Sequence, residues 1–403
     1  MKMLMISNLY PPNAIGGYER LCFSVAEALA NIGHEVGVLT STYGAGVTTY
    51  PGQHIWRSLL LLATEGNIYE PFNISYEKRN LINENNIIVL NGVISEYQPK
   101  VIFVWNLLFL DRSFIEEIEG KYSEITVYFL TDNWMISYFN PDYLGQYFTR
   151  VVFGSDKDED LLYEHKFKEL RGRAIFGSDY MARFYSNAGL KFMNSRVIHN
   201  GVDLQPVNEQ SYRDRLFTIS HSSLKLLFAG RVVAEKGIET VLRALPIISQ
   251  ELSGVDVTLD IVGDCQDTSY KEKLQDIIRR NSSTEVVRFR DPVPQGELFN
   301  LFQDYDIYLF PSLYEPFALT LIYALHAGIP TIASDIGGNP EIIFDEKTGL
   351  LFSKNNAPDM KDKVIILYRS GVKRANISRN AKKMAWENNF NRMLANIDEF
   401  LRS

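Results

Sequence analysis

Short runs of β-branched and aromatic residues alternate with amphipathic segments along the first part of the chain. Met3–Ser7 and Glu35–Thr40 have the apolar pattern of strands, and Glu19–Asn31 between them has the three- to four-residue spacing of a helix. Parallel strands need such crossover helices, so the alternation predicts a parallel sheet in an α/β fold. Further strands are predicted at Val101–Trp105, Thr126–Leu130 and Ala174–Gly177.

The same alternation begins again after about residue 200, which predicts a second domain of the same class. The polar segment Asp203–Ser223 separates the two halves. We expect two facing, doubly wound, Rossmann-like domains over residues 1–205 and 206–380, and a helix in 381–403 that packs back towards the first domain. Such sheets bind ligands at the carboxyl ends of their strands, so we expect the chemistry in a cleft between the domains. The second half is predicted to hold strands Lys225–Ala229, Val257–Val262, Val286–Arg290, Ile307–Phe310 and Thr331–Ala333 and helices Glu239–Ser249, Tyr270–Asn281 and Phe317–Ala327.

Residues 41–100 show no regular pattern. They contain the apolar run Ile55–Ala63 and the asparagine-rich segment Asn80–Gly92, and we place no element there. An exposed apolar run would indicate contact with a lipid-linked substrate at a membrane surface. Burial in the core is the alternative, and it is the one that we favour.

The charge and the cysteine content argue against some classes of protein. The 403 residues carry 41 basic and 49 acidic side chains, a formal net charge of −8, which has the wrong sign for wrapping nucleic-acid phosphates. Cys22 and Cys265 stand far apart in apolar surroundings, so we read them as buried thiols of a reducing compartment rather than as a disulfide. Met1–Tyr10 lacks the length and cleavage site of a signal peptide, and Phe317–Ser334 is interrupted by a glycine and a proline. We therefore expect a cytoplasmic protein.

Two adjacent glycines, Gly16 and Gly17, follow the first strand and open the first helix. Residues without a Cβ let backbone N–H groups approach an anion at the positive end of a helix. A purely structural turn between strand and helix explains the pair equally well.

Two cations, Arg231 and Lys236, follow the first strand of the second half. At the carboxyl edge of a parallel strand, two fixed positive charges are suited to binding a diphosphate. The alternative is that both are ordinary surface residues of a loop.

Glu315 lies in a proline-marked loop between a strand and an almost uncharged helix. The N–H groups of Phe317, Ala318 and Leu319 would lie free at the start of this helix, where they favour negative charge. Glu315 is then either a helix cap or a group that holds ligand hydroxyls.

These segments occur together with other short glycine motifs in a fixed order. The order is Gly16-Gly17, Ile198-His199-Asn200-Gly201-Val202-Asp203, Ala229-Gly230-Arg231 with Lys236-Gly237, Ile261-Val262-Gly263-Asp264, the Glu315 loop, Ile336-Gly337-Gly338-Asn339-Pro340-Glu341 and Thr348-Gly349-Leu350. In this respect nearly the whole chain resembles the retaining glycosyltransferases of the GT-B fold, in particular the class numbered family four.

The resemblance implies that the first domain binds an acceptor and the second a nucleotide sugar. Arg231 and Lys236 would bind the donor diphosphate, and Glu315 would hold hydroxyls of the donor sugar. Stabilising the charge that grows on a departing nucleoside diphosphate is a task suited to cations and a helix dipole. The other implied donor contacts are backbone at Gly16 and Gly17, backbone at Phe317, Ala318 and Leu319, and Gly263, Asp264 and the turn ending in Val293 near the nucleotide base.

The sequence departs from the family pattern at two places. Where the family usually has a second glutamate that binds ribose hydroxyls, this chain has Tyr323, and a phenol offers fewer acceptor sites than a carboxylate. Where many members have a histidine before an aspartate, this chain has Thr131 before Asp132. Asp132 is expected to serve the acceptor or the sugar; the alternative is an Asx turn after a strand.

We expect no metal and no cofactor. The six histidines show no ligand spacing, and the Asp-x-Asp segments at 156–158 and 304–306 read as solvated or capping residues. The chain lacks a Walker loop, a nucleophile elbow and a Gly-x-Gly-x-x-Gly motif.

The sequence therefore predicts a metal-independent hexosyltransferase that uses a nucleotide sugar, with UDP favoured, and a glycan or lipid-linked saccharide as acceptor. Its place would be the cytoplasm, with weak peripheral contact at the inner face of a membrane as an option. A nucleotide-sugar epimerase or a phosphorylase of the same fold, or a non-catalytic sugar-binding or scaffold protein, remain alternatives.

Overall fold

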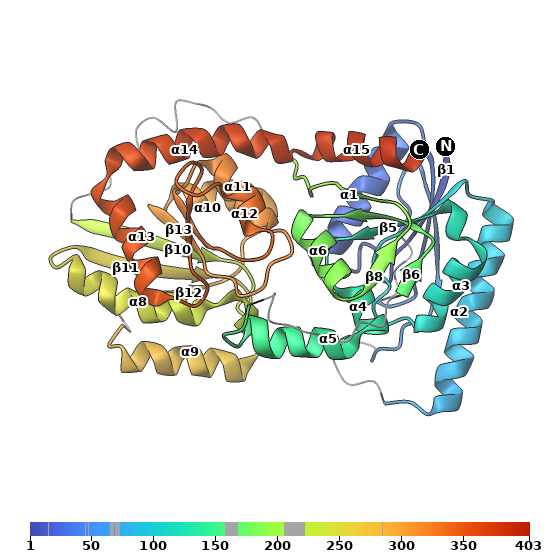
Figure 1. The fold of residues 1–403 in the computed structure, drawn as a ribbon, viewed down its shortest axis with the longest axis horizontal. Helices are drawn as coiled ribbons and strands as arrows, with labels where there is room; N and C mark the ends of the chain where they lie inside the picture. Colours follow the sequence, from blue (N-terminus) through green and yellow to red (C-terminus); the bar gives the residue numbers. More distant parts are fainter. Residues whose placement is uncertain are drawn as a thin grey trace. The chain divides into compact units, whose positions relative to one another are not determined.

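The computed structural model describes residues 1–14, 16–44, 46, 48–64, 68, 73–157, 168–204, 222–283 and 285–403 (Figure 1). The chain forms two compact units. Unit 1 comprises Met1–Tyr147, Glu159–His199 and Leu394–Ser403, and unit 2 comprises Phe148–Asp158 and Asn200–Met393. The predicted boundary between residues 205 and 206, and most of the predicted linker, lie outside the described residues.

Unit 1 is built on a seven-stranded parallel sheet with the order β3-β2-β1-β4-β5-β7-β9. The inner strand β1 (Lys2–Ile6) has four residues with no exposed surface, as expected for a strand covered on both faces. The other strands are β2 (Glu35–Ser41), β3 (Gln53–Leu59), β4 (Val101–Val104), β5 (Thr126–Leu130), β7 (Arg173–Phe176) and β9 (Ser195–Val197), with β6 (Lys168–Leu170) and β8 (Leu190–Phe192) in a separate pair. The helices are α1 (Gly17–Asn31), α2 (Tyr76–Tyr97), α3 (Arg112–Lys121), α4 (Trp134–Phe139), α5 (Pro141–Gln146) and α6 (Asp179–Asn187).

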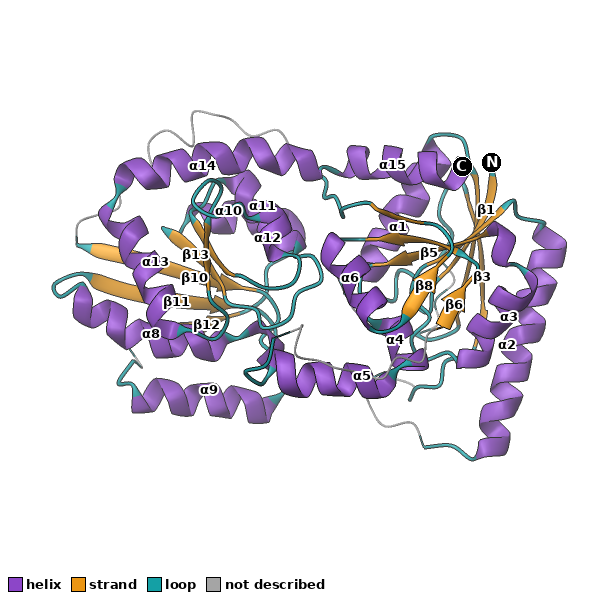
Figure 2. Cartoon of the chain, in the orientation of Figure 1, coloured by secondary structure: helices purple, strands orange, loops and turns teal. Residues whose placement is uncertain are grey.

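Unit 2 contains a six-stranded parallel sheet with the order β12-β11-β10-β13-β14-β15. Helices pack on both faces of this sheet (Figure 2). One buried apolar cluster joins α8, α9 and α13 to the sheet, and a second joins α10 and α11. The strands are β10 (Ser223–Ala229), β11 (Asp256–Val262), β12 (Val287–Arg290), β13 (Ile307–Phe310), β14 (Thr331–Ser334) and β15 (Leu350–Phe352), and the helices are α8 (Ile238–Glu251), α9 (Thr268–Arg280), α10 (Leu298–Gln303), α11 (Leu319–Ala327), α12 (Asn339–Ile342), α13 (Ala357–Arg369) and α14 (Gly371–Ala385).

The C-terminal helix α15 (Phe390–Arg402) belongs to unit 1 from Leu394 onward. His34 Nε2 lies 2.9 Å from Asp398 Oδ1, and burial lowers the pKa of this histidine. Arg173 Nη1 donates to the Phe400 carbonyl at 2.9 Å, and its guanidinium lies 5.2 Å from the centre of the Phe400 ring. Polar contacts of this kind fix the helix where its apolar face is buried.

The predicted strands of both halves are confirmed to within a few residues, and both units have the predicted α/β class. Residues 41–100, where we placed no element, contain strand β3 and the 22-residue helix α2. The apolar run Ile55–Ala63 is mostly buried or partly buried, and Leu60 at 37% is its most exposed member. The favoured interpretation of this run as core is therefore correct.

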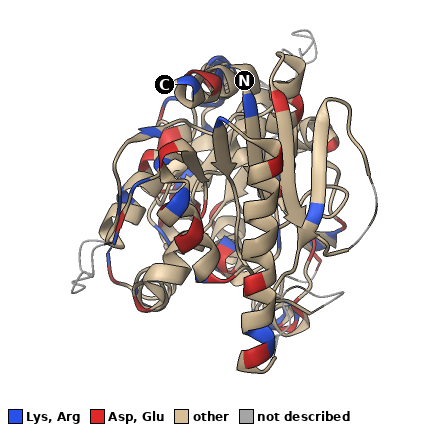
Figure 3. Ribbon diagram, turned by 90° about the vertical axis from the view of Figure 1, so that its right-hand side faces the viewer, with Lys and Arg blue, Asp and Glu red and all other residues tan. Residues whose placement is uncertain are grey.

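Helix α2 carries charges of both signs in its first turns, among them Glu77, Lys78, Arg79 and Glu84. Figure 3 shows Lys and Arg residues interspersed with Asp and Glu over this side of unit 1. A mixed surface does not create a strong field of one sign. Among the described helices, none is both long and apolar enough to cross a membrane.

Candidate functional site

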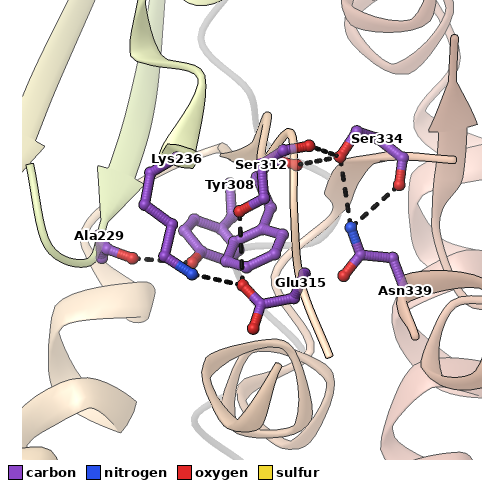
Figure 4. Close-up of polar contacts among 8 residues, drawn as sticks. Ala229, Lys236, Tyr308, Ser312, Glu315, Ser334 and Asn339 are labelled. Carbon is purple, nitrogen blue, oxygen red and sulfur yellow. Dashed lines mark hydrogen bonds and ion pairs between the residues drawn. The ribbon is translucent and has the colours of Figure 1, made fainter. Parts of the chain in front are cut away.

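The carboxyl ends of two neighbouring strands bring a lysine and a glutamate together in unit 2 (Figure 4). Strands β10 and β13 pair in parallel, so the segments that follow them meet at one edge of the sheet. Lys236 closes the turn after β10, and its Nζ donates to Oε2 of Glu315 in the loop after β13 at 2.5 Å. The side chains are 18% and 10% exposed. With so little water around them, the two charges interact strongly.

A hydrogen-bonded network supports the loop that carries Glu315. Ser312 Oγ lies 3.5 Å from Glu315 Oε2, and the Ser312 carbonyl accepts a bond from Ser334 Oγ at 2.5 Å. Asn339 Nδ2 donates to the Ser334 carbonyl at 3.0 Å and to its hydroxyl oxygen at 3.3 Å. All three residues are buried (Figure 4). These bonds tie the loop to β14 and α12, although Asn339 Oδ1 is buried without a hydrogen-bond partner among the described residues.

A glycine pair allows the backbone to approach this loop from α12. Gly338 N–H donates to the Glu315 carbonyl at 2.9 Å. Gly337 has φ +56°, and a Cβ built on it would lie 2.1 Å from the Glu315 carbonyl oxygen. Only glycine fits here without moving the loop, which explains the glycines of the Ile336–Glu341 motif in physical terms.

The turn that carries Lys236 is joined to the same loop through the backbone. Leu313 N–H donates to the Glu235 carbonyl at 2.7 Å. The ammonium of Lys236 also lies 5.7 Å from the centre of the Phe310 ring, within the range of a cation–π interaction. The cation and the carboxylate are therefore both fixed from neighbouring strands.

Helix α11 begins later than predicted. Its first residue is Leu319, with Ala318 as N-cap in an extended conformation, so Phe317 and Ala318 precede the helix. Both side chains are buried, at 6% and 3% exposure, and the extended backbone carries them into the core. The expectation that all three N–H groups open a helix is wrong for Phe317 and Ala318, which precede it. The N–H groups at the start of the helix belong to Leu319, Thr320 and Leu321, and the last of these donates to the Ala318 carbonyl.

Unit 1 holds the glycine pair at the start of α1. Gly16 is the N-cap and Gly17 the first helical residue. The N–H of Gly16 donates to Oε2 of Glu19 at 2.9 Å, which forms half of a capping box. Glu19 is buried at 6% exposure. The N–H of Gly16 therefore already has a carboxylate acceptor within the chain, which the sequence interpretation did not foresee.

Asp132 directly follows β5 in unit 1 and forms the centre of a second polar cluster. Its carboxylate accepts a bond from Trp134 N–H at 3.0 Å, and its carbonyl accepts one from the Tyr185 hydroxyl at 3.0 Å. Burial raises the pKa of Asp132 to about 6, against the Trp134 hydrogen bond and helped by the negative charge of Glu19. Burial also raises the pKa of Tyr18, whose hydroxyl donates to the Phe129 carbonyl and which senses the charge of Asp132. A carboxyl group with such a pKa is suited to taking up a proton near neutral pH.

Part of the sequence matches a known protein family. Residues 215–384, which include the Lys236–Glu315 pair and its supporting network, match the family described as glycosyl transferases group 1. The match therefore covers most of unit 2.

Similar proteins extend the match beyond this segment. The chain is 28% identical over 236 residues to a D-inositol 3-phosphate glycosyltransferase of Pseudarthrobacter chlorophenolicus, a match that covers 58% of this chain and 56% of the relative. The chain spans about half the length of the curated relatives of this kind that it matches.

Solved structures resemble the whole chain. Sucrose-phosphate synthase from Thermosynechococcus elongatus is similar with a TM-score of 0.73 at 20% identity, over 99% of this chain and 98% of that one. HepE from Anabaena, in a complex with UDP and glucose, is similar with a TM-score of 0.68 at 18% identity over the full length of both chains. The predicted GT-B fold is confirmed.

The other predicted donor residues of unit 2 lie along the carboxyl edge of its sheet. Arg231 follows β10 and is exposed, and among the described residues no hydrogen bond or ion pair joins its side chain. Val232 N–H next to it donates to the Asp264 carbonyl at 2.8 Å, and Gly263 N–H donates to the Arg290 carbonyl at 3.1 Å. Val293 is partly buried beside α10 and α11. Gly16, Gly17 and Asp132 belong to unit 1.

Tyr323, at the position of the usual second glutamate, has a partner that the sequence interpretation missed. Gln295 Nε2 donates to the Tyr323 hydroxyl. Burial raises the pKa of Tyr323, the bond from Gln295 lowers it, and the charge of Asp203 raises it again. Since its oxygen accepts from Gln295, the phenol remains able to donate its own proton.

The Asp-x-Asp segments do not carry new chemistry where the structure describes them. Asp306 Oδ2 accepts a bond from Lys225 N–H of β10 at 2.7 Å, just before β13 begins. Asp158 and the histidines His165 and His221 lie outside the described residues. Cys22 is buried and Cys265 partly buried, each as a free thiol.

Proposed function

We propose that the chain is a retaining hexosyltransferase that uses a nucleotide diphosphate sugar, with UDP as the favoured nucleotide, and transfers the sugar to a hydroxyl of a glycan or lipid-linked saccharide. The observation that carries the proposal is the Lys236–Glu315 pair at the carboxyl edge of a parallel sheet, inside the segment that matches glycosyl transferases group 1. The Lys236 ammonium is suited to binding a phosphate, and the Glu315 carboxylate is suited to accepting hydrogen bonds from hydroxyls.

In this proposal, different residues of unit 2 bind different parts of the donor. Arg231 and Lys236 bind the diphosphate, the start of α11 adds N–H groups, and Glu315 accepts hydrogen bonds from sugar hydroxyls. Gly263, Asp264 and Val293 border the base, with Tyr323 and Gln295 near the ribose. A metal ion is not required, because two cations and a helix terminus stabilise negative charge on the departing phosphate.

The chemistry follows from these roles. The bond between the anomeric carbon and the phosphate oxygen breaks, and its electron pair stays on the phosphate. The acceptor oxygen bonds to the anomeric carbon on the same face, and its proton passes to the departing phosphate oxygen. Asp132 serves the acceptor or the sugar in this reaction. UDP is favoured because the similar HepE structure contains UDP and glucose, and the reaction takes place in the cytoplasm or at the inner face of a membrane.

Donor binding is the first test, read as a shift in thermal stability with UDP-, GDP- and ADP-sugars. A ligand at about 100 times its Kd adds roughly 2.7 kcal/mol to the stability of the state that binds it. Arg231→Ala is the informative variant, because the exposed Arg231 side chain adds little to the stability of the unliganded protein. Arg280→Ala, at the exposed end of α9 in the same unit, is the matched control.

The proposal expects a shift with UDP-sugars that Arg231→Ala abolishes and Arg280→Ala retains. Turnover of the bound donor, with the anomer of the product read by NMR, then tests transfer and retention. A shift without turnover would instead support a non-catalytic nucleotide-sugar-binding protein. No shift with any donor would overturn the diphosphate site.

A further inference from the structure

A short segment between α5 and β6 packs in unit 2, although the chain on both sides of it belongs to unit 1. Residues Phe148–Asp158 belong to unit 2, while Tyr147 and Glu159 belong to unit 1. The segment begins with a π-helical turn, Tyr147–Val152, a conformation that is uncommon and frequent at functional sites. The described part of it, residues 148–157, is called the inserted segment below.

The inserted segment contacts the loop of Glu315 through an aromatic pair. The ring of Phe148 lies 5.0 Å from the ring of Tyr314, with an angle of 54° between the planes. Tyr314 directly precedes Glu315 in the chain. Aromatic pairs at this distance and tilt stabilise a contact beyond simple burial.

A second contact fixes the inserted segment at another strand end. Lys354, in the turn after β15, donates its Nζ to the Val151 carbonyl. Strands β13, β14 and β15 are parallel neighbours, so the segment is bound at the same edge of the sheet on which Glu315 lies. Val151 and Val152 are buried at 5% and 2% exposure.

The inserted segment is also held in shape by its own bonds. Arg150 Nη2 lies 2.6 Å from Asp156 Oδ2, and its Nε donates to the same oxygen at 2.7 Å. Asp156 N–H donates to the Arg150 carbonyl at 3.1 Å. A Cβ at Gly154 would lie 2.2 Å from that carbonyl oxygen, so the tight turn needs a glycine. The segment is therefore a preformed element that presents Phe148.

We propose that Phe148 is a positioning residue that acts through Tyr314 on the carboxylate of Glu315. The inference rests on the proposed function, because it takes Glu315 as the group that holds the donor sugar. Ser312 and Gly338 fix the loop from the sheet and from α12, and the Phe148 ring supports the residue next to the carboxylate. A carboxylate that must accept bonds from two hydroxyls at once depends on such support, since small displacements reduce both bonds.

The test is a double-mutant cycle of Phe148→Ala and Tyr314→Ala, with donor Kd, KM and kcat as readouts. Glu315 contacts the donor in the ground state and the transition state alike, so loss of its positioning raises KM more than it lowers kcat. We expect Phe148→Ala to raise donor KM and Kd by about tenfold with kcat within about threefold, and the double variant to lose no more than Tyr314→Ala alone. Phe148→Tyr, which keeps a ring, restores the affinity. Val372→Ala is the control, because Val372 of α14 lies in the same unit and is 72% exposed.

Hydrogen exchange of the protein alone separates this inference from the proposed function. Phe148→Ala is expected to speed exchange at residues 312–316 and to leave β10 and β11 unchanged, whether or not any donor binds. Additive effects in the cycle, or unchanged exchange at 312–316, would overturn the role of Phe148. Faster exchange at 312–316 without donor binding in the wild type would uphold the contact and overturn only the proposed function.

Discussion

Lys236 and Glu315 satisfy each other's charge, which sets a condition on any ligand. A diphosphate that binds Lys236 must share it with Glu315 or replace Glu315 as its partner. Removing one member of a pair with side-chain exposures of 18% and 10% leaves an uncompensated charge in little water, which is costly. A donor that offers a phosphate to the lysine and hydroxyls to the carboxylate replaces the lost ion pair with one new ion pair and with hydrogen bonds to the carboxylate, so the pair favours ligands with both groups.

The raised pKa of Asp132 makes stability depend on pH in a defined direction. A carboxyl group with a pKa of about 6 in the folded protein and about 4 in the unfolded chain binds more protons when folded between these values. The free energy of unfolding therefore falls as the pH rises from 4 to 6 and is level above that range. In Asp132→Asn this slope is absent. Relative to the wild type, the variant is expected to gain roughly 2 kcal/mol between pH 4 and pH 7, measured by urea unfolding.

Glu19→Gln tests one of the contributions to the raised pKa of Asp132, the other being burial. The charge of Glu19 contributes to the raised pKa of Asp132, so its removal is expected to shrink the slope without abolishing it. For the preceding prediction, the contradicting outcome is a free energy of unfolding that changes with pH in the same way in wild type and Asp132→Asn. The pKa of Asp132 would then be the same in the folded protein and the unfolded chain.

The glycine pair before α12 is the feature of an element on which the site depends most directly. In Gly337→Ala the new Cβ meets the Glu315 carbonyl oxygen, and the positive φ adds strain. Gly254→Ala is the matched control, since Gly254 has φ +88° and open space around the added carbon. We expect both variants to lose stability, Gly337→Ala by roughly 1–3 kcal/mol more, with only Gly337→Ala also weakening donor affinity. Equal losses in urea unfolding would mean that the loop yields easily.

Some elements were predictable from the sequence and others were not. Most of the strands were, because each predicted strand is a short apolar run ended by glycine, proline or polar residues. Strand β3 and the three-residue strands β6, β8, β9 and β15 were not predicted. Helix α2 was not, because apolar residues and asparagines are mixed around it. Asn86 of α2 instead bonds both backbone groups of Leu60, each at 2.8 Å. A helix fixed by tertiary hydrogen bonds leaves no periodic signal in the sequence.

Some residues of the candidate site could likewise be predicted from the sequence, and others could not. Lys236 and Glu315 stood out as charged residues after strands, and parallel strand ends converge, so their proximity follows from topology. The contributions of Ser312, Ser334 and Asn339 depend on the order β13-β14 and on side-chain rotamers, which no short motif reveals. Glu19 was visible as the acidic residue three positions after Gly16, which is the spacing of a capping box.

At the scale of the whole molecule, unit 1 depends on the far end of the chain. Ile397 of α15 has no exposed surface. Ile397→Ala is expected to cost about 2–5 kcal/mol and to speed hydrogen exchange in β1 while β10, in unit 2, stays protected. Glu399→Ala, at a side chain that is 68% exposed in its pair with Arg196, is the control and should change little. Faster exchange in β10 instead of β1 would contradict this assignment of α15.

The position of α15 in the chain also bears on how the protein is made. All of Asn200–Met393 is translated between the main part of unit 1 and the residues of α15 that join it. At roughly 5–20 residues per second, translation of this stretch takes about 10–40 seconds. Throughout that time the surface of unit 1 that α15 later covers remains uncovered. During that time unit 2 emerges and can fold ahead of the domain that was begun first. Nascent unit 1 is thus the part of this protein for which a chaperone has the longest opportunity to bind.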